Sequence, residues 1–279
     1  MMKKSKVLLS LLMLGAVLFI GGLALWPRSG QGEGTKPTNA TVFFHGYGSS
    51  RNAEKTMSQY LVKKKYSSQI INVTVSKNGE VHFSDQAQRG KKNPLYLVQF
   101  NDNRNVNYAK TNQWVTSIMR QIHQQGIHSV NLIGHSMGNM AIVYYLKNHV
   151  QPSDQLPSVK KEIDIAGHFN SLGADPAAQS EVDEAGKPSI QSSSYQALSG
   201  LSAYYQHNQT KVLNIFGNST GASHSDGTVP NNSSKTLRSF VTAPSQYEEK
   251  LLTGKDAQHS RLHENQQVNQ LLFDFLTTN

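Results

Sequence analysis

Cysteine is absent from the 279 residues of the chain. Its absence excludes disulfides, thiol catalysis and thiolate metal sites, so an exported domain would depend on its core alone for stability. The zinc-binding pattern His-Glu-x-x-His is also absent, and basic residues do not alternate with aromatic ones as in many nucleic-acid-binding proteins. We therefore expect no metal, no cofactor and no nucleic-acid partner.

Charged side chains are few, at 16% of the residues, and the formal net charge is +9. Residues 1–28 carry four positive and no negative side chains, which leaves +5 for the rest of the chain, an excess that ordinary solvated lysines explain. Hydrophobic residues make up 37% and occur in short blocks between polar turns, as in a globular protein. The length suits one large α/β domain and leaves no room for a second catalytic domain.

The first 28 residues differ in composition from the rest. Three lysines precede an apolar run at 7–26 that contains no charged residue. This pattern predicts an export signal or a membrane anchor over residues 1–28, with the membrane as a partner. The run is long enough to cross a hydrocarbon core of about 30 Å, whereas cleaved signals have shorter apolar runs, so we favour an anchor. Cleavage after a small residue at 21, 22 or 24 remains open.

A polar, glycine-rich stretch, SGQGEGTKPT, follows at 29–38 and predicts a flexible tether. The folded domain is then expected to span 39–279. Because the lysines precede the apolar run, we expect this domain at the extracellular face of the cell membrane, or secreted if the leader is cleaved.

Short blocks rich in β-branched and aromatic residues alternate with helical patterns along the domain. The clearest helix is the last, where apolar residues recur at i, i+3, i+4, i+7 and i+8, namely Val268, Leu271, Leu272, Phe275 and Leu276. This alternation predicts an α/β fold with a doubly wound, mostly parallel sheet. Its expected strands are 40–44, 69–75, 95–100, 129–133, 162–165, 211–216 and 247–252.

One stretch interrupts the alternation. Residues 166–210 are polar and rich in serine, glutamine and alanine. Connections of this length are usually functional or mobile, so the segment is either a lid-like insertion over a site or a surface excursion.

Gly134-His-Ser136-Met-Gly138 matches G-x-S-x-G, the turn that raises a serine hydroxyl between a strand end and a helix start. The pattern is short enough to arise by chance. Its context supports it, because an expected strand at 129–133 ends just before it and an amphipathic pattern at 137–146 follows. Ser136 is therefore the candidate nucleophile.

A serine hydroxyl needs a base, and the base needs an orienting acid. In folds that carry this motif the acid follows the serine, and the histidine follows the acid. Asp226 comes shortly after the strand expected at 211–216 and is the best-placed acid; others lie within a strand or in the insertion, namely Asp164, Asp175 and Asp183. For the base, His259 and His263 both precede the last helix, and position alone leaves the choice open. His149 and His168 come too early after the serine, and His224 is placed to line a pocket.

The tetrahedral intermediate of acyl transfer carries a negatively charged oxygen that backbone N–H groups stabilise. One donor is expected from Met137, directly after the nucleophile. The other is expected from Tyr47 in the turn His45-Gly-Tyr-Gly48, where glycines allow the backbone to approach closely. We expect His45 to hold this turn by a hydrogen bond.

HGYG after the first strand, GHSMG, the later SDGTVP and HSRLHEN before the last helix together resemble the α/β-hydrolase superfamily. The likeness is greatest to the uncharacterised cell-surface α/β hydrolases of Gram-positive bacteria, and it covers residues 40–279. In related small lipases the pattern H-x-x-L, with valine six residues after the leucine, marks the catalytic histidine. His259, Leu262 and Val268 match this pattern, so the resemblance favours His259 over His263.

The combined hypothesis is a serine hydrolase that cleaves an ester-type acyl substrate through Ser136, His259 and Asp226, similar to a carboxylesterase or lipase. A peptidase or amidase using the same triad is the alternative within enzymes. A surface-anchored binding module that kept the fold without turnover is the alternative outside them.

Overall fold

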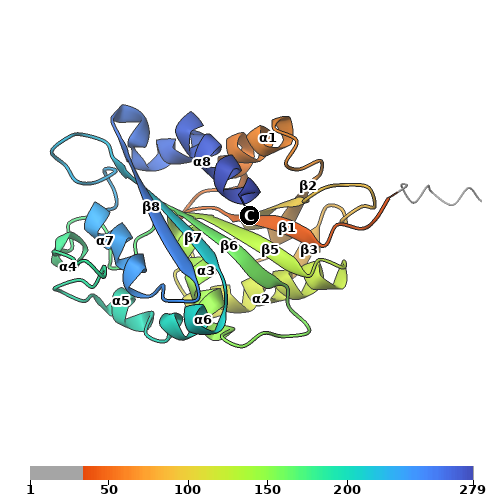
Figure 1. Cartoon of the computed structure of the whole chain (residues 1–279), viewed down its shortest axis with the longest axis horizontal. Helices are drawn as coiled ribbons and strands as arrows, with labels where there is room; N and C mark the ends of the chain where they lie inside the picture. The colour runs from red at the N-terminus through yellow and green to blue at the C-terminus, as the bar shows by residue number, and fades with distance from the viewer. Residues whose placement is uncertain (1–33, 279) are drawn as a thin grey trace, which may run out of the picture. The chain divides into compact units, whose positions relative to one another are not determined.

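The computed structural model describes residues 34–278, and its centre is an eight-stranded sheet (Figure 1). The strand order is β3-β2-β4-β1-β5-β6-β7-β8. All neighbouring strands pair in parallel except β2 and β3, which are antiparallel. The strands are β1 (Asn39–Phe44), β2 (Ile70–Val75), β3 (Val81–Phe83), β4 (Leu95–Phe100), β5 (Ser129–His135), β6 (Ser158–Ile165), β7 (Lys211–Asn218) and β8 (Gln246–Thr253).

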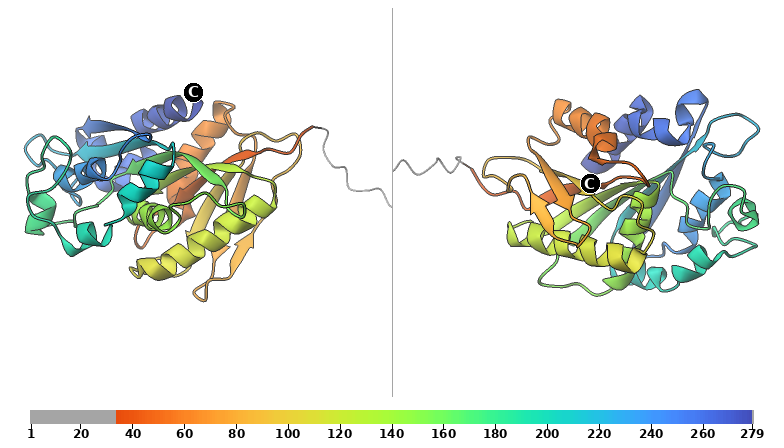
Figure 2. Two further views of the ribbon diagram at one scale, coloured as in Figure 1. Left: turned by 60° about the horizontal axis from the view of Figure 1, so that its bottom comes forward. Right: turned by 180° about the vertical axis from the view of Figure 1, so that it is seen from behind.

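Helices cover both faces of the sheet, as α1 and α8 on one side and α2, α3 and α6 on the other show in Figures 1 and 2. This layering is the expected solution for parallel strands, whose two apolar faces must both be shielded from water. The α-helices are α1 (Lys55–Lys63), α2 (Tyr108–Gln124), α3 (Met137–Asn148), α4 (Pro176–Gln179), α5 (Ser193–Ala197), α6 (Leu201–His207), α7 (Asn231–Lys235) and α8 (Gln266–Thr277). Four 3-10 turns accompany them: η1 (Arg51–Glu54), η2 (Thr236–Ser239), η3 (Lys255–Ala257) and η4 (His259–Glu264).

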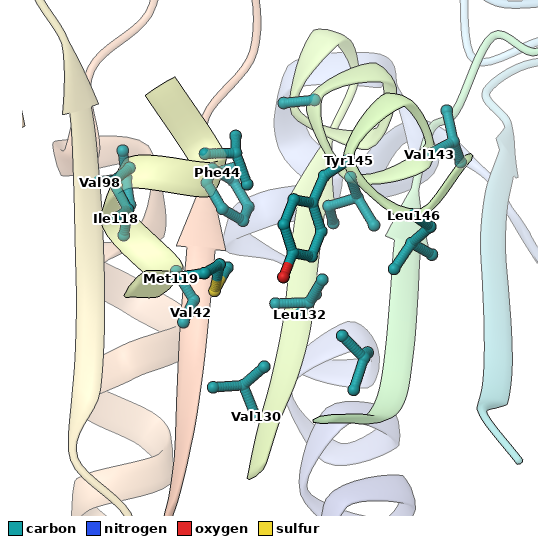
Figure 3. Close-up of a cluster of buried hydrophobic side chains, with 14 of the residues drawn as sticks. Val42, Phe44, Val98, Ile118, Met119, Val130, Leu132, Val143, Tyr145 and Leu146 are labelled. Atoms are coloured by element: carbon teal, nitrogen blue, oxygen red, sulfur yellow. The ribbon is translucent and has the colours of Figure 1, made fainter. Parts of the chain in front are cut away.

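The larger of the two apolar clusters lies between the sheet and α2 and α3. Phe44 of β1 and Leu132 of β5 face Met119 and Tyr145 of these helices (Figure 3). All four side chains are at most 3% exposed. Burying a side chain of this size stabilises the fold by about 1.5–3 kcal/mol, so this packing fixes β1 and β5, the strands that lead into the candidate site.

The expected fold class is confirmed, and each of the seven expected strands has a counterpart among β1, β2 and β4 to β8. The sequence did not indicate β3. This strand is only three residues long and has no buried residue, so it lacks the apolar block by which the other strands were found.

Residues 166–210 contain α4, α5 and α6. α6 packs against α3, with Tyr204 and Tyr205 buried in the larger apolar cluster. The part of the segment before α6 borders the loop that carries Asp226, since Gly173 N–H donates to the Thr228 carbonyl over 3.0 Å. A lid role for this earlier part stays a prediction.

The expected leader at 1–28 and the first part of the expected tether lie outside the described residues. From Thr35 onward the chain already bonds to the domain: the Thr35 carbonyl accepts from Gly90 N–H over 3.0 Å, and the Thr38 carbonyl accepts from His128 N–H over 2.9 Å. Within residues 34–278, none of the helices has the length and apolar character needed to span a bilayer.

Two carboxyl groups are buried on one face of β6. Glu162 and Asp164 are two residues apart, so their side chains project to the same side of the sheet. Tyr205 Oη donates to Glu162 Oε2 over 2.7 Å, whereas neither oxygen of Asp164 meets a donor within the described chain. Burial raises the pKa of Glu162 to about 7, and burial together with Glu162 raises the pKa of Asp164 well above its usual range. Burial and the neighbouring Glu162 therefore favour the protonated form of Asp164.

This pair predicts that stability falls as the pH rises. A carboxyl group whose pKa is higher in the folded state contributes its full stabilisation below the pKa it has in the unfolded chain, near 4. That contribution is lost as the pH rises through the pKa of the folded state. Asp164→Asn removes one of the two titrations. Its free energy of unfolding relative to the wild type should rise by about 1 kcal/mol per pH unit between pH 5 and 7. Urea denaturation at several pH values measures this.

The matched control is Asp154→Asn, which neutralises an exposed carboxylate in the loop after α3. Its difference from the wild type should stay nearly constant with pH. A constant difference for Asp164→Asn as well would show that Asp164 is already ionised in the folded protein.

Candidate active site

Ser136 lies at the sharp turn between β5 and α3. Its φ of 54° and ψ of −118° are a strained conformation for a residue with a side chain. The turn is held to β6, because the Ile165 carbonyl accepts from Ser136 N–H over 2.9 Å. A Cβ on Gly138 would overlap the Phe44 carbonyl oxygen, and one on Gly134 would overlap Asn139. Both glycines of the motif are thus explained by close packing.

His259 is the first residue of η4 and faces Ser136. Its Nε2 lies 3.0 Å from Ser136 Oγ, and its Nδ1 lies 2.7 Å from Asp226 Oδ2. A carboxylate only accepts hydrogen bonds, so Nδ1 carries the proton and Nε2 has the free lone pair. In this tautomer the imidazole is ready to accept the serine proton.

Asp226 follows β7 and is 1% exposed. Its Oδ1 accepts from the N–H groups of Thr228 and Val229 over 2.8 and 2.7 Å. The Asp226 carbonyl also accepts from His259 N–H over 2.9 Å. With the bond between the two side chains, the acid and the histidine are linked twice, which fixes both the carboxylate and the imidazole in place.

The turn after β1 passes close to the serine. A Cβ on Gly46 would lie 3.2 Å from Ser136 Cβ. His45 spans the turn: its Nδ1–H donates to the Gly46 carbonyl over 2.8 Å, and its Nε2 accepts from Phe100 N–H over 3.1 Å. Burial lowers the pKa of His45, so this side chain is neutral and structural, as expected from the sequence.

The two expected oxyanion donors are the backbone N–H groups of Tyr47, in the turn after β1, and of Met137, directly after the serine. Tyr47 N–H has no hydrogen-bond partner within residues 34–278. Met137 is the first residue of α3, so its N–H has no partner inside the helix. Both N–H groups are therefore free to bind an anionic oxygen.

The other candidates are placed elsewhere. His263 also lies in η4, but it makes no hydrogen bond to Ser136 or Asp226, and its Nδ1 is buried without a partner in the described structure. Burial lowers the pKa of His263. The remaining aspartates do not meet His259: Asp164 is inside β6, Asp175 caps α4, and Asp183 accepts from Lys187 N–H.

Two further histidines lie near the Asp226 loop. Burial is the main reason that the pKa of His168 falls to about 4; His259 also lowers this pKa, and Asp226 opposes the shift. His224 lines a hollow of about 780 Å³ whose wall includes Gly227 and Thr228, the residues directly after Asp226. His149 bonds to Tyr145 and Thr116 and does not touch this region.

Sequence reasoning gave no role to His135, the residue before the nucleophile. Its Nε2 lies 3.0 Å from the His259 carbonyl oxygen, and its ring centre lies 4.9 Å from that of His259 and 5.0 Å from that of His263. One feature of the sequence could have indicated a role for His135. It occupies the first variable position of G-x-S-x-G, and this turn is packed on every side. No cluster of three or more histidine or acidic side chains suited to a metal occurs in the described part of the chain.

Comparison with solved structures supports the fold. A gene product of Listeria innocua superposes with a TM-score of 0.78 at 22% identity, over 87% of this chain and 95% of that one. A protein assigned as a cell surface hydrolase, from Lactobacillus plantarum WCFS1, superposes with a TM-score of 0.63 at 19% identity, over 87% and 90% of the two chains. At these identities the likeness concerns the fold alone. No curated protein matches the sequence.

A family model described as alpha/beta hydrolase of unknown function (DUF915) matches residues 29–279. The match extends from before the first strand to the last residue, and so includes every group of the candidate site. The chain therefore belongs to this family of α/β hydrolases, as the sequence resemblance implied.

Proposed function

We propose that the protein is a serine hydrolase that transfers the acyl group of an ester to water through Ser136, His259 and Asp226. One observation carries the proposal: His259 lies between a serine hydroxyl at 3.0 Å and a buried carboxylate at 2.7 Å. This is the relation of nucleophile, base and orienting acid that activates a hydroxyl.

In the first half of the reaction, Ser136 Oγ attacks the ester carbonyl while His259 Nε2 takes the hydroxyl proton. Asp226 stabilises the resulting imidazolium through Nδ1–H. The negative charge on the carbonyl oxygen is bound by the N–H groups of Tyr47 and Met137. When the tetrahedral intermediate collapses, the bond to the alcohol breaks and His259 returns the proton to the leaving oxygen.

In the second half, water replaces the alcohol. His259 Nε2 takes a proton from the water, whose oxygen attacks the acyl carbon. The bond to Ser136 Oγ breaks, and the proton passes from His259 to the serine. The carboxylic acid leaves and the enzyme is restored. The residues of the chain supply every group that these steps need.

The surroundings of the site favour a small ester over a long-chain lipid. In the segment before α6, Leu172 and Ile190 are exposed, whereas Phe169 is fully buried. Leu201 at the start of α6 is buried as well. Two isolated exposed apolar side chains are common on any protein surface, and a lipid-binding face needs a larger contiguous patch.

We also propose that the enzyme works at the extracellular face of the cell membrane, held there by residues 1–28. The support is the three lysines ahead of the apolar run at 7–26. The Lactobacillus plantarum protein with the same fold is assigned to the cell surface, which agrees with this location.

Ser136→Ala should abolish hydrolysis of short p-nitrophenyl esters, because it removes the attacking hydroxyl and no core volume. A fall in kcat on the order of 10⁴-fold or more is expected. A fluorophosphonate probe should label the wild type and not the variant. The matched control is Ser199→Ala, an exposed serine whose side chain makes no hydrogen bond to any of residues 34–278. Full turnover in purified Ser136→Ala would exclude the mechanism, and an unlabelled wild type would favour a binding module.

His259→Ala should reduce kcat nearly as far as Ser136→Ala, and the double variant should be little worse than either single one, because triad members act as a unit. His263→Ala should cost far less, because His263 bonds to neither Ser136 nor Asp226. Measuring kcat/KM of both histidine variants, with circular dichroism to verify folding, separates the two. An inactive His263→Ala beside an active His259→Ala would reverse the assignment of the base.

Removal of residues 1–34 should release the enzyme from the membrane without loss of esterase activity. The full chain, expressed in a Gram-positive host, should sediment with membranes and be digested by protease added to intact cells. The shortened chain, produced without an export signal, should stay in the soluble fraction. A full-length chain found in the cytosol would contradict the proposed location.

A further inference from the structure

His135 connects the nucleophile turn to the loop that carries the base. It is the last residue of β5, directly before Ser136, and it is buried, with 5% of its surface exposed. Its Nε2 lies 3.0 Å from the backbone carbonyl oxygen of His259. A carbonyl oxygen only accepts, so Nε2 carries the proton and donates, and Nδ1 has the lone pair.

This bond completes the fixation of the base. The N–H of His259 donates to the Asp226 carbonyl, and the C=O of His259 accepts from His135, so the backbone of this residue is held at both ends. The side chain is held by Asp226 at Nδ1 and meets Ser136 at Nε2. Three of these four bonds are made by Asp226 or Ser136, which belong to the triad. The fourth comes from His135, a side chain outside the triad, and it links the base to the strand that carries the nucleophile.

The ring of His135 also fills the space between two neighbouring loops. A Cβ on Gly46 would lie 3.2 Å from His135 Nδ1, so the turn after β1 passes directly against this ring. The rings of His259 and His263 contact it at centre distances of 4.9 and 5.0 Å. Burial, with smaller contributions from His259 and His263, lowers the pKa of His135 well below its usual value. The ring is therefore neutral, and it keeps the donor arrangement that the bond requires.

We propose that His135 is a positioning residue for the reaction: its Nε2–H holds the His259 carbonyl and so sets the distance between His259 Nε2 and Ser136 Oγ. This inference rests on the proposed function of Ser136 and His259. His135 itself touches no reacting atom. Its effect on the rate is expected because a displacement of about 1 Å at a reacting group can cost on the order of 10²-fold.

Two variants of similar size separate the hydrogen bond from the packing. His135→Gln replaces the ring with an amide whose N–H can still donate to the His259 carbonyl. His135→Met fills similar space without a donor. With p-nitrophenyl acetate as substrate, we expect His135→Met to lower kcat by about 10- to 100-fold with KM within about twofold, and His135→Gln to keep kcat within a few-fold of the wild type. Both should show similar shifts in Tm.

A double variant shows whether the effect passes through the base. If His135 acts only by positioning His259, then His135→Met should reduce the residual rate of His259→Ala by less than twofold. If the role of His135 were merely structural, His135→Met would lower the rate by the same factor in the wild type and in His259→Ala. Equal kcat values for the Gln and Met variants, or a full effect of His135→Met in the His259→Ala background, would overturn the proposal.

The hydrogen bond has a measurement that needs no turnover. In ¹⁵N-histidine NMR spectra at pH 7, His135 should appear as the neutral Nε2–H tautomer, and its assignment follows from the signal lost in His135→Gln. A neutral Nδ1–H tautomer or a charged ring would refute the bond even in an active enzyme. If the wild type neither hydrolyses the ester nor reacts with the fluorophosphonate, the proposed function of the triad fails. The spectrum still tests whether His135 donates a hydrogen bond to the His259 carbonyl.

Discussion

Parallel pairing of β1, β5, β6 and β7 is the constraint on which the candidate site depends. Parallel strands end at the same edge of a sheet, so the segments that follow them meet there. Segments far apart in the sequence supply Gly46, Ser136 and Asp226 at this edge. The loop after β8 adds His259, since β8 is also parallel to β7. Sheet topology therefore brings the groups together, and local hydrogen bonds only adjust their distances.

The turn at Ser136 is strained, and the packing around it offsets the free-energy cost of this strain. A residue with a side chain at φ 54° is held there because α3 approaches β1 closely at Gly138 and because the Ser136 N–H bonds to Ile165. Strain of this kind costs on the order of 1–3 kcal/mol. The buried residues of β1 and β5 that pack under α3 are large enough to offset it. The hydroxyl is thereby presented at the helix start and not buried in the strand.

Much of the fold could be predicted because its signals are local. Buried parallel strands appear as apolar blocks, and the last helix appears as a regular spacing of Val268, Leu272 and Leu276. Chain order, which follows from topology, pointed to Asp226 and left His259 and His263 as possible bases, and the resemblance to small lipases then favoured His259. The side chains of Asp226 and His259 lie where the hypothesis needs them. β3 was missed because it is short and half-exposed. The contact of His135 with the His259 carbonyl spans 124 positions, and no local pattern in either segment encodes such a distance.

The shell around His259 limits where positive charge can form. Burial lowers the pKa of His135 and His168, so these neighbouring rings are neutral at pH 7. If one of them were charged, it would repel the imidazolium that forms on His259 when Ser136 loses its proton, and the barrier to acylation would rise. Neutral rings instead exclude water and leave Asp226 as the nearest opposite charge. The burial of several histidines is therefore linked to catalysis. Among the rings near the nucleophile, it leaves only that of His259 both paired with a carboxylate and able to accept the proton.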